Sequence, residues 1–217
     1  MLSGFEALKC VCNIFVGRGY ANSANNRISV DAEGNPIPWI AYPAFDYIQG
    51  LDLSGKTVFE FGSGCSTLYW ATVCAQVFSV ENDREWFAKV SAVAPLNCKI
   101  VLCEEEENYV HTLSARSNSF DVIVIDGAFN RRKMAELAIQ KLAPGGFIML
   151  DNSDCHVKAA KVLRDSGLIQ VDMNGFAPGS PSEQTTSFFL MRDFNFRPKG
   201  EYQPLKTPWC MKHFVDE

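Results

Sequence analysis

The chain has 217 residues, of which 47% are hydrophobic and 21% charged, and its formal net charge is −5. This composition is typical of a soluble globular protein with a substantial core. It argues against a nucleic-acid-binding protein, which needs a basic face, so we expect a small-molecule partner and no nucleic acid.

The chain begins with an apolar run at residues 7–16, which Lys9 and Asn13 interrupt. The run is shorter than the roughly 20 residues that cross a bilayer, and it lacks the basic start and cleavage site of a signal peptide. We expect a short amphipathic helix that packs on the domain or on a partner, and no membrane association. The polar residues 17–37 predict a loop or mobile segment. Residues 1–40 thus form an N-terminal helix-and-loop segment.

A helix is expected to open at Pro43, because proline suits a first helical turn. Seven apolar runs then predict strands at 57–61, 76–80, 98–103, 120–125, 146–151, 168–173 and 186–192. Helix-like stretches lie between the earlier runs, at 66–74, 83–93, 106–115, 131–142 and 155–166. This alternation predicts an α/β fold, Rossmann-like, with a mostly parallel sheet and helices on both faces.

Only residues 174–185 separate the last two strands, and no helix fits there. We therefore expect these strands to form an antiparallel pair, joined by a loop that serves as the acceptor lid. The domain is expected to cover residues 41–192. The aromatic tail, residues 193–217, is expected to wrap its surface without regular structure.

The eight cysteines show no paired spacing of the kind that binds zinc. Most lie on predicted strands and helices, as small apolar residues do. We interpret them as reduced thiols and expect a cytoplasmic protein.

A glycine turn follows the first strand, in the stretch VFEFGSGCSTLYWA from Val58 to Ala71. A dinucleotide-binding turn reads G-x-G-x-x-G and holds a pyrophosphate, but here Thr67 stands at the third position. Glu60, two residues before the first glycine, would repel a pyrophosphate and attract the sulfonium and ammonium groups of S-adenosylmethionine. The residues of the turn that we assign to this cofactor are Glu60, Gly62, Ser63, Gly64, Ser66 and Thr67.

Two further strands end in acids. Glu81 lies about 20 residues beyond Glu60, the spacing at which a carboxylate meets ribose hydroxyls, and we assign it to the cofactor together with the adjacent Asn82. Glu104 follows the third strand, where it is placed to accept the adenine amino group; the alternative is a solvated acid in a first helical turn.

These motifs are followed by FDVIVID (Phe120–Asp126) and LAPGGFIMLD (Leu142–Asp151). Together they resemble the class I S-adenosylmethionine-dependent methyltransferases over about residues 40–192. The resemblance implies a seven-stranded sheet with the last strand antiparallel, S-adenosylmethionine as cofactor, and transfer of a methyl group to an acceptor, for which a hydroxyl oxygen is the leading candidate.

The strand ends also resemble the metal site of catechol and caffeoyl-CoA O-methyltransferases. The resemblance implies a divalent cation, Mg2+, held by Asp126, Asp151 and Asn152, which would orient the acceptor hydroxyl and lower its pKa. Those enzymes use as base a lysine three residues after the first Asp, where this chain has Phe129. The remaining candidates for catalytic groups are Asp126, Lys133, Arg131, Arg132 and His156.

Other readings stay open at this point. Asp151 and Asn152 could simply cap a helix, and Trp39, Tyr42 and Phe45 could line the cleft or pack in the core. The alternatives for function are a metal-free methyltransferase on N, C or S acceptors, a non-catalytic nucleoside-binding domain, and, less favoured, an NAD(P)-dependent oxidoreductase. A homodimer is compatible with the sequence.

Overall fold

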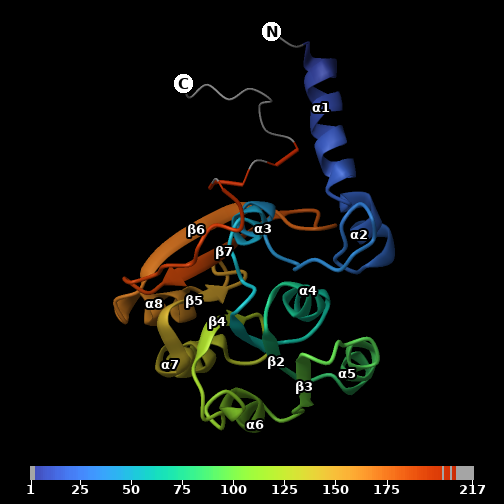
Figure 1. The fold of residues 1–217 in the computed structure, drawn as a ribbon. Coiled ribbons are helices and arrows are strands. Elements are labelled where there is room, and N and C mark those ends of the chain that lie inside the picture. Colours follow the sequence, from blue (N-terminus) through green and yellow to red (C-terminus); the bar gives the residue numbers. More distant parts are fainter. Residues whose placement is uncertain (1–2, 202, 206, 209–217) are drawn as a thin grey trace.

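The structure is a computed structural model that describes residues 3–201, 203–205, 207 and 208. One seven-stranded sheet runs through the molecule in the order β3-β2-β1-β4-β5-β7-β6 (Figure 1). Its strands are β1 (Thr57–Phe61), β2 (Gln76–Glu81), β3 (Cys98–Leu102), β4 (Phe120–Ile125), β5 (Leu142–Leu150), β6 (Ile169–Phe176) and β7 (Glu183–Leu190). Strands β1 to β5 are parallel, and β7 pairs antiparallel with both β5 and β6. The predicted fold, including the antiparallel last strand, is confirmed.

Helices cover both faces of the sheet. They are α3 (Tyr42–Gln49), α4 (Cys65–Val73), α5 (Arg84–Ser91), α6 (Glu106–His111), α7 (Arg131–Lys141) and α8 (Val157–Asp165). Val58 faces the core layer under α3 and α4, whereas Phe59 faces the layer under α6, α7 and α8. This alternation follows from the strand period of two. Because β2, β1, β4 and β5 are neighbours in the sheet and run parallel, their carboxyl ends lie side by side at one edge of the sheet.

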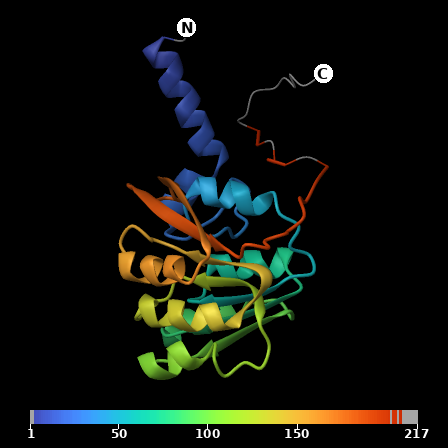
Figure 2. The same cartoon turned by 90° about the vertical axis from the view of Figure 1, so that its left-hand side faces the viewer.

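The N-terminal segment differs from its prediction in two respects. Residues 20–26 form a helix, α2 (Tyr20–Asn26), inside the stretch expected to be a loop. Helix α1 (Gly4–Gly17) is present and carries a Ser3–Glu6 capping box, but none of its residues is buried. It projects away from the sheet (Figure 2), and Phe5 is 79% exposed. Of the two expected alternatives, packing on the domain applies only to the last turn of α1, through Phe15, and packing of the rest on a partner stays a prediction.

The expected lid loop is shorter than predicted and is backed by α2. Strands β6 and β7 extend to Phe176 and from Glu183, so that residues 177–182 remain as the connection. Gly179 has φ +66°, and a Cβ there would lie 2.6 Å from the backbone N of Ala24. The Tyr20 hydroxyl donates to the Ser180 carbonyl oxygen at 2.5 Å. Backbone contact and hydrogen bond together hold this loop against α2.

After β7 the chain runs back past the start of the sheet. The Asp52 N–H donates to the Arg197 carbonyl oxygen, and the Lys199 N–H to that of Gly50, both at 2.8 Å. Phe194 and Phe196 stack with ring centroids 5.0 Å apart. Three aromatic residues of the tail, Tyr202, Trp209 and Phe214, lie outside the described residues. The seven cysteines of the described part are all free, and no helix in that part is both long and apolar enough to cross a bilayer.

Candidate active site

The turn after β1 depends on Gly62. Its φ is +99°, in the region that favours glycine, and a Cβ there would meet the Asp126 carbonyl oxygen at 3.1 Å. The Gly62 N–H donates to the Val80 carbonyl oxygen at 2.9 Å. Glycine is therefore what lets the end of β1 approach the ends of β2 and β4 so closely.

Glu60 points into the molecule, not into bulk water. It is 1% exposed, and its carboxylate accepts a hydrogen bond from the Thr67 hydroxyl on α4. Burial raises the pKa of Glu60 to about 8; the hydroxyls of Ser66 and Thr67 oppose this rise, whereas the charges of Asp126 and Glu81 add to it. At neutral pH the carboxyl of Glu60 is mostly protonated.

Glu81 is also buried, and its carboxylate accepts four hydrogen bonds. Ser63 donates two of them, from its N–H at 3.0 Å and its hydroxyl at 2.7 Å. The N–H groups of Asn82 and Asp83 donate the others, at 2.8 and 2.9 Å. Because a carboxylate offers about four acceptor positions, a ribose diol would have to replace the bonds from Ser63. Asn82 takes part through its backbone.

Trp86 lies against the glycine turn. Its indole N–H donates to the Ser63 carbonyl oxygen at 2.7 Å, and a Cβ on Gly64 would be 3.6 Å from the ring. Sequence reasoning missed this residue. The available signal was Asp83, which caps α5 by accepting from the Trp86 N–H at 2.7 Å and so fixes the first turn of that helix.

Glu104 faces the surface. Its carboxylate pairs with Arg84 at 2.5 Å, with the Glu104 and Arg84 side chains 50% and 70% exposed. The geometry places it in a solvated ion pair beside the first turn of α6.

Arg131 ties the ends of β4 and β5 together. Its guanidinium donates to the Asp126 carboxylate at 2.9 Å, to the Gly127 carbonyl oxygen at 3.0 Å and to the Asp151 carbonyl oxygen at 2.6 Å. The Arg131 side chain is only 10% exposed, against 35% for that of Asp126. Arg131, considered from sequence only as a base, is instead a buried positive charge that holds the site together.

The Asp151 carboxylate turns toward β7. It accepts from the Gln184 amide at 3.1 and 3.0 Å and from the Thr186 hydroxyl at 2.6 Å. Burial raises the pKa of Asp151 to about 7, and the charge of Asp126 contributes further. Asn152 follows with φ +48°, a left-handed conformation that Asn tolerates well.

These residues do not fit a divalent cation. The Asp151 carboxylate already accepts hydrogen bonds from Gln184 and Thr186 on β7. The Arg131 guanidinium already bridges the ends of β4 and β5. In the part of the chain that the structure describes, no group of three or more His, Cys, Asp or Glu side chains is placed to hold a metal ion. The Arg131 guanidinium thus bridges the two strand ends at which the sequence predicted Mg2+.

The residues expected to act in catalysis lie in different places on the molecule. Lys133 has its Nζ 3.9 Å from Glu106 and is 60% exposed, on the α6 side of α7. Arg132 forms an exposed pair with Glu136. His156 is half-buried at the start of α8, where burial and then the charge of Arg131 lower its pKa. Of the three, His156 is the one that lies near the strand ends.

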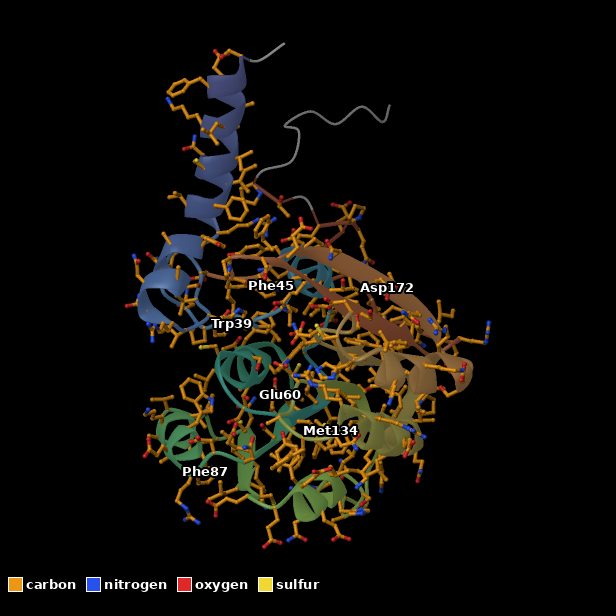
Figure 3. All side chains as sticks on the ribbon, turned by 180° about the vertical axis from the view of Figure 1, so that it is seen from behind. Trp39, Phe45, Glu60, Phe87, Met134 and Asp172 are labelled. Carbon is orange, nitrogen blue, oxygen red and sulfur yellow. The ribbon has the colours of Figure 1, made fainter. Side chains whose placement is uncertain are left out.

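Of the three aromatic residues that precede β1 and were expected near the cleft, two are buried and one is exposed. Tyr42 and Phe45 are buried in the core layer under α3 and α4. Trp39 is 46% exposed, and Figure 3 shows it on the segment that passes between α2 and α4. Of the three, Trp39 is the one whose side chain is exposed.

No protein-family profile and no curated protein matches this sequence. Solved structures do match. A precorrin-6y C5,15-methyltransferase from Geobacter metallireducens has a TM-score of 0.53 and 13% identity, covering 67% of this chain and 87% of its own. A putative rRNA-methylase from Clostridium thermocellum has a TM-score of 0.51 and 13% identity, covering 70% and 96%. A precorrin 8w decarboxylase from Methanobacterium thermoautotrophicum has 0.51 and 16%, covering 64% and 84%.

The fold is that of the class I methyltransferases. At these identities the likeness concerns the fold alone, and the matching proteins are named for different reactions and substrates. In a class I methyltransferase fold, as in other open α/β sheets, ligands bind beyond the carboxyl ends of the strands. The buried acids Glu60, Glu81 and Asp151 lie at those ends here, with Asp126 beside them.

Proposed function

We propose that this protein is an S-adenosylmethionine-dependent methyltransferase that acts on a small-molecule acceptor without a divalent cation. One observation carries the proposal: four carboxylates meet at the ends of the four neighbouring strands β2, β1, β4 and β5. Arg131 is the one cation paired with any of them among the described residues. The four are Glu60, Glu81, Asp126 and Asp151.

Such a cluster favours a cationic ligand. Neighbouring negative charges raise each other's pKa, and a nearby cation reverses that effect. Burial is the main cause of the raised pKa of Glu60, and the charges of Asp126 and Glu81 add to it across the site. A sulfonium and an ammonium group would relieve this repulsion, whereas a pyrophosphate would increase it. Glu81 suits the ribose, and the turn around Gly62 allows close approach of the backbone.

The bound cofactor supplies an activated methyl group, and the chain has to hold the acceptor in line with it. We assign the acceptor to the space beside Asp126 and His156. The lowered pKa of His156 keeps its imidazole neutral near pH 7, so that it can take a proton from an acceptor hydroxyl. A net charge of −5 and an acidic site favour a small acceptor over a polyanionic nucleic acid. We place both sites in the domain of residues 41–192.

Calorimetry with S-adenosylhomocysteine and with NAD tests the proposal. We expect micromolar binding of the first, on the order of −8 kcal/mol, no binding of NAD, and the same affinity with EDTA or Mg2+. Binding of NAD instead would support the oxidoreductase and overturn the proposal. Binding of S-adenosylhomocysteine without methyl transfer to a broad panel of phenols and amines would favour a nucleoside-binding module. A loss of methyl transfer with EDTA that added Mg2+ reverses would support the metal site instead.

A further inference from the structure

Helix α1 carries an apolar stripe that the described part of the protein leaves largely exposed. Phe5, Leu8 and Cys12 follow one another at intervals of four residues or fewer, which places them on one face of the helix. Phe15 continues this stripe, and its ring packs edge to face against two aromatic rings of the body. Phe5 and Leu8 are 79% and 61% exposed. The stripe therefore begins at the body and runs outward without a cover.

A helix of this kind needs a partner for its apolar side. α1 spans 14 residues, and isolated helices of about 12–15 residues are marginal in water. Val11 and Val16 on the same helix are also exposed. Its charged residues are one acid, Glu6, and one base, Lys9, so α1 lacks the basic face of a helix that lies on a membrane surface. A protein surface is therefore the kind of partner that suits it.

The described chain ends at the foot of α1. The tail packs on the end of α3, where a Cβ on Gly50 would lie 3.5 Å from the Cβ of Leu205. Pro208 then lines a hollow of about 310 Å³ together with Gly17 and Arg18, the last residue and the C-cap of α1. Figure 2 shows the red residues of the tail on the same side of the sheet as α1.

The chain continues beyond Pro208 with residues 209–217, of sequence WCMKHFVDE. Nine residues reach roughly 30 Å when extended, whereas a helix of 14 residues is roughly 21 Å long. The large apolar side chains of this segment are those of Trp209, Met211, Phe214 and Val215. The segment thus starts beside α1, is long enough to follow it, and carries the side chains that would cover its stripe.

A second copy of the chain is the competing protein surface. The exposed side chains of α1, those of Phe5, Leu8, Val11 and Val16, offer on the order of 100 Å² each, less in total than the roughly 600 Å² per partner that a stable interface buries. The tail is already attached, and a short connection holds it at an effective concentration of about millimolar. It needs less buried area than a free partner, because it does not lose the freedom of a separate molecule.

We propose that the C-terminal segment 209–217 docks along the exposed stripe of α1 in the same molecule. The two ends of the chain then form one unit on the α3 side of the sheet. Because α1 leads into α2, which holds the loop 177–182, this unit also supports the segment behind that loop. The inference does not depend on the cofactor or the reaction proposed above.

The cysteines of the chain provide a direct test in the full-length protein. Cys10 and Cys12 are both exposed free thiols on α1, but they lie about 200° apart around the helix, and only Cys12 is on the stripe. Cys210 lies in the docked segment. We compare Cys10→Ser and Cys12→Ser after mild oxidation with diamide, and map the disulfides by mass spectrometry of peptides.

A disulfide forms only where two Cα atoms come within about 7 Å. We therefore expect Cys10→Ser to form an intramolecular bond between Cys12 and Cys210, roughly tenfold more than Cys12→Ser forms between Cys10 and Cys210. Equal yields from the two thiols would show that the tail is not held on the stripe and would overturn the proposal. A bond between Cys12 residues of two molecules would assign the stripe to a second copy instead.

Hydrogen exchange of the α1 amides gives an independent measure that needs no cysteine. Phe214→Asp should speed this exchange roughly tenfold, because the helix loses its cover and opens more often. Leu96→Asp is the matched control: Leu96 is a fully exposed apolar residue of the turn before β3, and its replacement should leave exchange in α1 unchanged. Identical exchange in Phe214→Asp and the wild type would overturn the proposal.

Discussion

The carboxylate of Glu81 accepts both the N–H and the hydroxyl of Ser63, at 3.0 and 2.7 Å. The end of β2 is thereby joined to the glycine turn that follows β1, and the acid that suits the ribose already has a partner in the ligand-free protein. A ribose diol bound to Glu81 would replace the two donors of Ser63 with its own two hydroxyls.

Replacing Glu81 by Gln should weaken S-adenosylhomocysteine binding roughly tenfold or more, because charged hydrogen bonds to the ribose become neutral ones. Glu104→Gln is the matched control: its carboxylate is half exposed and pairs with Arg84, so we expect less than about a twofold change. Both affinities can be measured by calorimetry. A larger loss for Glu104→Gln would place the adenine at Glu104, as the sequence suggested.

Binding of S-adenosylmethionine should release protons near neutral pH. Burial holds the pKa of Glu60 at about 8, so the carboxyl is mostly neutral at pH 7. A sulfonium nearby favours its ionised form and lowers the pKa. Affinity should therefore rise as the pH approaches 8, and the observed enthalpy should depend on the ionisation enthalpy of the buffer. An enthalpy independent of the buffer contradicts this prediction.

The same carboxyl should make the ligand-free protein less stable as the pH rises. A pKa raised above its unfolded value means that the folded state holds the extra proton, so the contribution of Glu60 to stability is complete below the ordinary glutamate pKa of 4.5 and is lost as the pH rises through about 8. In Glu60→Gln the fall in unfolding midpoint between those two pH values should be smaller than in the wild type. Parallel curves would show that Glu60 does not titrate in this way.

Gly62→Ala should destabilise the protein by about 1–3 kcal/mol, through a left-handed backbone and through the contact of the new methyl with the Asp126 carbonyl oxygen at 3.1 Å. Gly167→Ala is a matched control, because Gly167 has φ +92° with nothing within 4 Å of its added Cβ. Chemical denaturation gives both values. Equal losses of stability in the two variants would mean that backbone strain alone destabilises Gly62→Ala, with no contribution from the close approach to Asp126.

Removing the guanidinium of Arg131 by mutation to Met should cost about 1–3 kcal/mol, because Asp126 and two carbonyl oxygens lose their donor. Arg132→Met, on the next residue of α7 in an exposed pair with Glu136, should change stability by less than about 0.5 kcal/mol. Because Asp126 is about a third exposed, water would compensate part of the loss. Unfolding of Arg131→Met at the wild-type midpoint would refute the bridging role of Arg131.

The order of strands and helices could be predicted because each depends on local pattern. Apolar runs, the turn at Gly62 and the acids that end the strands all lie within a few residues of the elements they mark. The prediction failed where local composition was ambiguous. Residues 20–26 are polar and still form α2, because packing of Ala24 against Gly179 supplies what their propensity does not.

The sequence by itself determined the sheet, the glycine turn and the acids Glu60, Glu81 and Asp126 at its edge, since the side-chain period and the crossovers place strand ends together. Only the tertiary structure decided what those acids touch. Thr186 reaches Asp151 across 35 residues and the Ala41 N–H across 145, and Arg131 joins two strand ends. Such partners depend on distance in space, which the spacing along the chain does not give, and they place the Arg131 guanidinium at the two strand ends where the sequence predicted a metal ion.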